Sequence, residues 1–133
     1  MVGVSRYTLF LRFRCGYACG DRETSLFRAR PAFDGHTELL VSTASAWEIA
    51  TKYRLGKLGE AEAVVHGYPD HLARLRAREL PISSHHALTA GLLNWAHRDP
   101  FDRMIAAQCM LESIPLATAD TTLASFPGIR VVW

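Results

Sequence analysis

Three acidic residues occupy the same kind of position in the sequence. Glu48, Asp102 and Asp120 each lie shortly after a predicted strand or in the first turn of the helix that follows one. Because the carboxyl ends of parallel strands meet at one edge of a sheet, we expect the three side chains to converge there. Clustered carboxylates repel one another unless a hard cation joins them, and Mg²⁺ or Mn²⁺ suits such oxygen ligands. The spacing therefore predicts a divalent-metal site, which can activate water and stabilise charge on a phosphodiester.

Each of these carboxylates also has a purely structural interpretation. Ser45 and Glu48 have the spacing of a capping box, in which the glutamate would accept from the serine amide. Asp102 would favour the positive end of its helix, and Asp120 would cap the helix that follows it. Asp99 is suited to cap a helix whose first residue is a proline. Only the shared placement of the acids favours the metal site over capping.

The elements that must position these residues alternate between strands and helices. Strands are predicted at 7–13, 39–41, 114–117 and 129–133, and residues 80–83 are either a short strand or an extended link. Helices are predicted at 46–54, 69–79, 84–96, 100–113 and 121–126. Such alternation is typical of an α/β domain with a mostly parallel central sheet. Trp47 and Trp95 are expected in its core.

The composition indicates one domain over residues 1–133. With 49% hydrophobic residues the chain can build a core, and its net charge of +2 does not by itself indicate a nucleic-acid partner. Three cysteines at uninformative spacing suggest reduced thiols, and no apolar run approaches the length of a membrane span. We therefore expect a cytoplasmic protein without a membrane segment.

Longer stretches around the acidic residues resemble the motifs of one family. The segment VSTASAWEIATK at 41–52, with RLGKL at 54–58, resembles the second acidic motif of PIN-domain proteins of the VapC toxin type. The segment HRDPFDRMIAAQ at 97–108 resembles the third motif of that family. The segment LATAD at 116–120, with the closing VVW, resembles the fourth. Order and spacing agree across residues 38–133.

This resemblance implies a fold, an activity and a set of partners. The fold would be an α/β/α sandwich, and the activity that of a Mg²⁺- or Mn²⁺-dependent endoribonuclease. The protein would be the toxin of a type II toxin–antitoxin pair, dimeric, acting on RNA and silenced by a VapB-like antitoxin. Carried over by position, Glu48, Asp102 and Asp120 become metal-site carboxylates. Thr118 becomes an accessory hydroxyl, and Asp99 a second acid near the site.

The first 36 residues depart from the family pattern. The family opens with a strand that ends in an aspartate, typically Asp-Thr-His-x-Leu-Leu-Trp, and residues 1–36 contain no such motif. They contain six arginines and no lysine, as translation of the wrong frame of a GC-rich gene would produce. We therefore expect a poor nuclease. The open alternatives are a diverged start in which Asp21 or Asp34 reaches the site, a catalytically impaired PIN fold that binds an antitoxin or RNA, and an unrelated α/β domain whose acids only cap helices.

Overall fold

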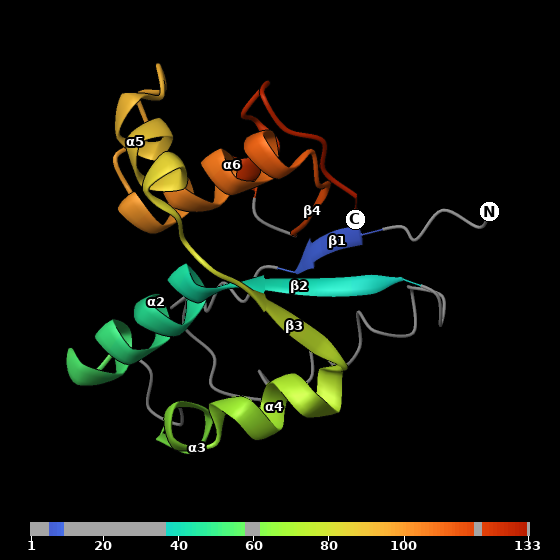
Figure 1. Cartoon of the computed structure of the whole chain (residues 1–133). Coiled ribbons are helices and arrows are strands. Elements are labelled where there is room, and N and C mark those ends of the chain that lie inside the picture. The colour runs from blue at the N-terminus through green and yellow to red at the C-terminus, as the bar shows by residue number, and fades with distance from the viewer. Residues whose placement is uncertain (1–5, 10–36, 58–61, 119–120, 133) are drawn as a thin grey trace.

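A computed structural model describes residues 6–9, 37–57, 62–118 and 121–132, in which strands and helices alternate (Figure 1). The strands are β1 (Arg6–Leu9), β2 (Glu38–Ser42), β3 (Ala77–Leu80) and β4 (Leu116–Ala117). The helices are α2 (Thr43–Arg54), α3 (Glu62–His66), α4 (Tyr68–Leu75), α5 (Ser84–Leu92), α6 (Pro100–Glu112) and α7 (Thr121–Ala124). None of the helices in these described ranges is long and apolar enough to cross a membrane.

The four strands form one parallel sheet in the order β3-β2-β1-β4. Thr8 of β1 lies opposite Leu40 of β2 on one side and Leu116 of β4 on the other, so β1 is an inner strand. The strand predicted at 7–13 is therefore found as Arg6–Leu9, and residues 10–13 lie outside the described part of the chain. All strands end at the same edge of the sheet, which is where ligands of parallel α/β folds bind.

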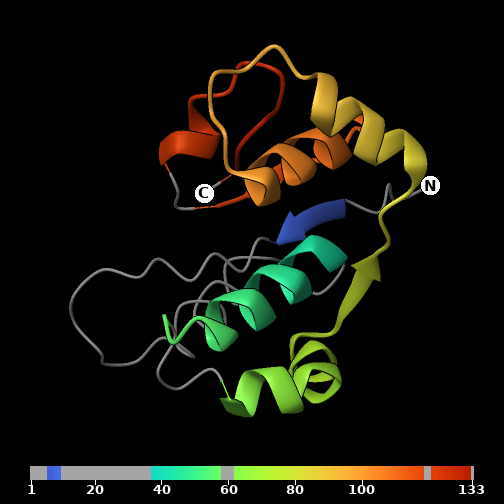
Figure 2. The same cartoon turned by 90° about the vertical axis from the view of Figure 1, so that its left-hand side faces the viewer.

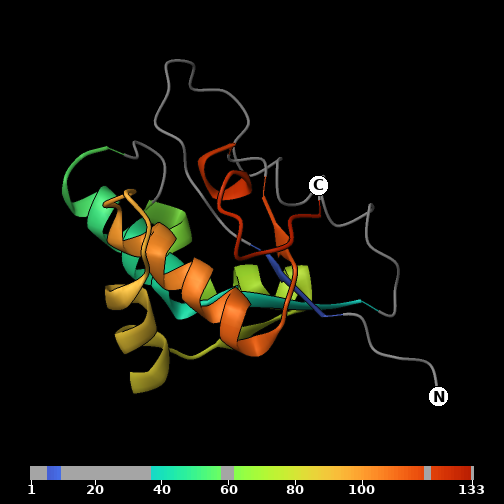
Figure 3. The same ribbon diagram turned by 90° about the horizontal axis from the view of Figure 1, so that it is seen from above.

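Helices cover both faces of the sheet and give it the predicted α/β/α layers. Helices α5 and α6 lie side by side on one face, and α3 and α4 lie on the other (Figures 1, 2 and 3). One buried apolar cluster consists of Val41, Ile49, Val64, Leu72 and Ala117. A second consists of Ala44, Ile105, Cys109, Leu116 and Leu123. The burial of these side chains from water is the main favourable term in the stability of the sandwich.

Several predicted element boundaries differ from those of the structure. The helix predicted at 69–79 ends at Leu75, because Arg76 adopts the left-handed conformation with φ 52°, and the strand considered at 80–83 is β3 at 77–80. The helix predicted at 84–96 ends at Leu92. The strand predicted at 129–133 is reduced, in the described residues, to one bridge between Leu116 and Val131.

The start of α2 also differs from the prediction. The helix begins at Thr43, and its N-cap is Ser42, whose Oγ accepts from the Ala44 amide at 3.1 Å. The capping box of Ser45 and Glu48 is therefore wrong, since both residues lie inside the helix. In this register Trp47 faces outward with 57% of its surface exposed, so its predicted place in the core is wrong as well.

A buried hydrogen-bond network joins the carboxyl ends of two strands to α6. Ser42 Oγ donates to Gln108 Oε1 at 2.5 Å, and both residues are fully buried. Gln108 Nε2 in turn donates to the carbonyl oxygens of Leu80 at 3.4 Å and Pro81 at 3.2 Å. A buried polar group that loses its partner costs free energy, so these hydrogen bonds favour forming together. They thereby hold the ends of β2 and β3 and helix α6 in one relative position.

We predict that Ser42→Ala lowers the free energy of unfolding by about 2 kcal/mol, because the helix cap and the donor to Gln108 are lost together. Urea denaturation measures this difference. The matched control is Ser84→Ala, since Ser84 is exposed at the start of α5. Equal effects of the two substitutions would contradict a structural role for the network.

Candidate metal centre

Helices α2 and α6 bring Glu48 and Asp102 to the carboxyl edge of the sheet. Helix α2 starts where β2 ends, and Glu48 lies in its second turn with 1% of its surface exposed. Helix α6 runs back toward the start of β4, so its first turn, with the fully buried Asp102, lies at the same edge. The rings of Trp47 and Phe101, one residue before each acid, meet edge to face with centroids 4.7 Å apart.

Asp99 caps α6 as predicted and also lies in the acidic cluster. Its Oδ1 accepts from the amides of Phe101 at 2.9 Å and Asp102 at 3.4 Å. One ligand atom each from His97, Asp99 and Asp102 lie within 4.8 Å of one another. His97 Nε2 is 2.5 Å from Asp102 Oδ2. Capping and membership of the cluster are therefore compatible roles.

Glu48 experiences both burial and the neighbouring charges. Burial raises the pKa of the Glu48 carboxyl, the ion pair with Lys52 opposes this shift, and the charges of Asp99 and Asp102 add to it. Lys52 Nζ donates to Glu48 Oε1. Glu48 Oε2 is buried and has no hydrogen-bond partner among the described residues. A buried carboxylate oxygen of this kind is costly unless a cation or donor binds it.

The donors at this edge fit a divalent cation. They comprise carboxylate oxygens, the ligands that Mg²⁺ and Mn²⁺ prefer, and one imidazole nitrogen. Thr118 directly follows β4 at the same edge and is buried. Asp120, the third predicted carboxylate, lies outside the described residues.

Arg103 was not predicted to matter, yet its guanidinium organises the segment before α6. Its Nε donates to the Ala90 carbonyl at 3.0 Å, Nη1 donates to Trp95 at 2.8 Å and His97 at 3.1 Å, and Nη2 donates to Gly91 at 3.3 Å and Leu93 at 2.7 Å. The sequence contains one hint of this role. A cation in the first turn of a helix opposes the helix dipole, so it requires another reason to be there.

The chain belongs to the PIN domain family, whose model matches residues 17–129. The match begins upstream of Glu38, where the resemblance of the motifs starts, and downstream of β1. The parallel sheet with helices on both faces agrees with the α/β/α sandwich that the resemblance implied.

One sequence relative and two solved structures are similar to this chain. Ribonuclease VapC16 from Mycobacterium tuberculosis is 46% identical over 57 residues, which is 43% of this chain and 39% of the relative. This match therefore spans well under half of the length of VapC16.

Both solved structures match nearly the whole chain. One is VapBC2 from Rickettsia felis bound to a DNA fragment from the promoter, with a TM-score of 0.59 and 14% identity over 96% of this chain and 97% of the matched chain. The other is DNA-bound VapBC from Salmonella typhimurium, with a TM-score of 0.61 and 16% identity over 95% and 96%. At these identities the two structures establish the fold.

We predict a pH-dependent effect of Glu48→Gln on the metal-free protein. Because the pKa of Glu48 is raised in the folded state, the stability that its proton contributes is present below about pH 4.5 and is lost as pH rises through the raised pKa. The amide of the variant cannot ionise, so its unfolding free energy relative to that of the parent should increase over this window. Urea denaturation between pH 4.5 and 7 tests this, with the exposed Glu62→Gln as control.

We also predict that Arg103→Lys lowers the free energy of unfolding by about 2 kcal/mol. An ammonium group cannot reproduce the fork of N–H donors, so several carbonyls lose their partner. Hydrogen exchange of the amides at 93–97 should increase together with the loss of stability. The neighbouring exposed Arg98→Lys is the control, and comparable effects at both positions would refute the organising role of Arg103.

Proposed function

We propose that this chain is a metal-dependent endoribonuclease, the toxin of a type II toxin–antitoxin pair. The proposal is supported by the cluster of His97, Asp99 and Asp102 in a PIN-family fold, and by the charges of the two aspartates, which raise the pKa of the Glu48 carboxyl. The similarity to Ribonuclease VapC16 supports the choice of RNA as substrate.

Each residue of the proposed site would have its own role in phosphodiester hydrolysis. Glu48, Asp102 and Asp120, with Asp99 beside them, would hold Mg²⁺ or Mn²⁺. When bound, such an ion lowers the pKa of the water that it binds and stabilises negative charge on the phosphate oxygens. Thr118 would orient a water or phosphate oxygen through its hydroxyl. Lys52 balances the charge of Glu48 before the ion arrives, which favours the ionised form of this buried carboxylate.

The exposed Trp47 offers a surface for an RNA base beside the acids. It lies next to Glu48 in sequence, and its ring packs against Phe101, next to Asp102. Unpaired bases stack on exposed aromatic rings, and each such contact contributes about 1–3 kcal/mol. A single strand whose base stacks on Trp47 would have its backbone near the carboxylates.

We predict that Trp47→Ala weakens binding of single-stranded RNA by about tenfold, the lower half of that stacking range. Fluorescence anisotropy with a labelled oligonucleotide measures the affinity, and Mn²⁺ affinity should stay unchanged. Trp47→Phe, which keeps an aromatic face, is the control. Unaltered RNA affinity in both variants would contradict the base-stacking role.

A VapB-like antitoxin would regulate this activity, with the toxin present as a homodimer in the cytoplasm. The two solved structures of similar fold are VapBC complexes, and this similarity supports the choice of partner. Co-purification of a small partner encoded next to the gene tests this part of the proposal independently of cleavage.

A second candidate is an impaired PIN fold that binds RNA or an antitoxin without cleaving RNA. The observation that favours it is the sequence of β1, RYTL, which brings no carboxylate to the centre of the sheet. Incubation of RNA with the chain and Mn²⁺ or Mg²⁺, beside the Asp102→Asn variant, separates the two. Metal-dependent cleavage that falls by about 100-fold or more in the variant supports the nuclease, and RNA binding without cleavage supports the binding module.

A further inference from the structure

We propose that His97 is a nitrogen ligand of the metal centre and makes the site selective for Mn²⁺ over Mg²⁺. This inference deepens the proposed function and rests on it, because both require a divalent ion at the carboxyl edge of the sheet.

The positions of three ligand atoms carry this assignment. One ring nitrogen of His97 and one carboxylate oxygen each from Asp99 and Asp102 lie within 4.8 Å of one another. Two ligands of one ion at about 2.0–2.2 Å are at most about 4.4 Å apart. The widest separation among the three atoms exceeds this limit by no more than about 0.4 Å, and the other separations must adjust to the smaller angles between neighbouring ligands. The 2.5 Å contact of His97 Nε2 with Asp102 Oδ2 must lengthen by a similar amount.

His97 is held where it is by contacts on two sides. Arg103 Nη1 donates to the His97 carbonyl at 3.1 Å and fixes the backbone. The imidazole ring packs against Trp95, with centroids 4.8 Å apart. The side chain nevertheless keeps 25% of its surface exposed, so an ion can reach Nε2 from solvent. A ligand fixed in advance loses little entropy when it binds.

Glu48 provides a second and independent indication of a cation. A simple ion pair between His97 and Asp102 would explain their contact, but it leaves Glu48 Oε2 buried without a hydrogen-bond partner among the described residues. Glu48 lies near enough to Asp99 and Asp102 for their charges to raise the pKa of its carboxyl. A cation bound by the three ligand atoms would also lower the electrostatic cost of this buried carboxylate.

The nitrogen donor decides which cation is preferred. Mg²⁺ favours oxygen ligands and retains its waters, whereas neutral imidazole is a good ligand for first-row transition metals. Replacing one oxygen by nitrogen thus costs Mg²⁺ more affinity than Mn²⁺.

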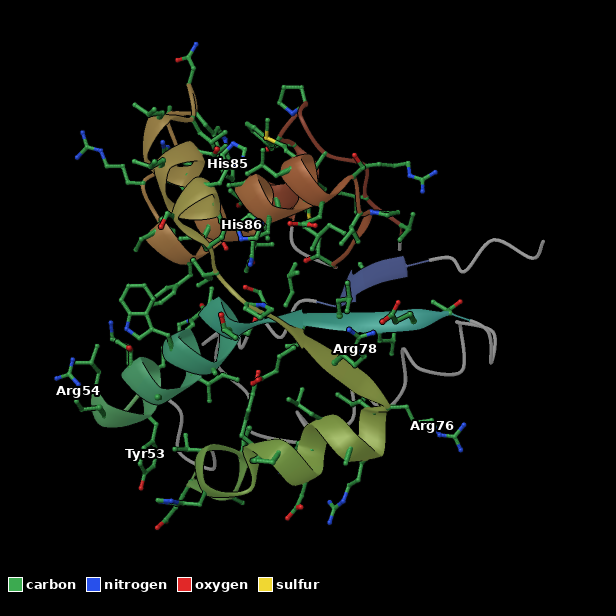
Figure 4. All side chains as sticks on the ribbon, viewed as in Figure 1. Tyr53, Arg54, Arg76, Arg78, His85 and His86 are labelled. Atoms are coloured by element: carbon green, nitrogen blue, oxygen red, sulfur yellow. The ribbon has the colours of Figure 1, made fainter. Side chains whose placement is uncertain are left out.

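The test uses the full chain loaded with Mn²⁺. Pulsed electron paramagnetic resonance should detect coupling to a ¹⁴N nucleus in the parent and in the control His85→Ala, in which an exposed histidine of α5 is removed (Figure 4). The coupling should disappear in His97→Ala, with Mn²⁺ affinity lowered about tenfold by calorimetry. In His97→Asp the coupling should also be absent, and the preference for Mn²⁺ over Mg²⁺ should shrink because the new ligand is an oxygen.

Two results would overturn the inference in different ways. Mn²⁺ binding without nitrogen coupling in the parent, or with coupling that persists in His97→Ala, removes His97 from the site and leaves the proposed nuclease intact. No binding of either ion to the parent chain, whose own thermal unfolding verifies the fold, overturns the proposed function as well.

Discussion

The buried contact between Ser42 and Gln108 is the constraint on which the rest of the site depends. Glu48 belongs to α2 and Asp102 to α6, and their two carboxylates repel each other when both are ionised. Ser42 ends β2, caps α2 and donates to Gln108 of α6, so one hydroxyl ties together the two helices that carry the carboxylates. The fold thereby stabilises a repulsive arrangement that the acids alone would not adopt.

The neighbouring residues lower the electrostatic cost of this arrangement. Lys52 pairs with Glu48, His97 contacts Asp102, and Asp99 lies at the positive end of α6, where a negative charge is favourable. Each compensation is local and incomplete, since burial still raises the pKa of Glu48. A site that is partly but not fully neutralised retains an attraction for a cation without collapsing in its absence.

The elements predicted correctly are those whose signals are local. Asp99 and the proline after it mark the start of α6 within two residues, so this boundary and the cap could be predicted from sequence. The start of α2 could not, because Ser42 and Ser45 are both acceptable caps and a contact with Gln108, distant in sequence, selects the first. Trp47 was misplaced for the same reason. The roles of Lys52, His97 and Arg103 depend on which groups the fold brings near them.

The first strand shows why fold and chemistry can separate in this chain. β1 pairs with β2 and β4 through backbone groups, which every residue except proline supplies, so RYTL can occupy the centre of the sheet without the family's aspartate. A metal site, by contrast, depends on particular side chains, so it does not tolerate the substitutions that the sheet tolerates. In the proposed site, a sheet without that aspartate would leave the metal to Glu48 on α2, to Asp99 and Asp102 at the start of α6, and to Asp120 after β4. The nitrogen donor of His97, just before α6, would then have a larger influence on which ion binds.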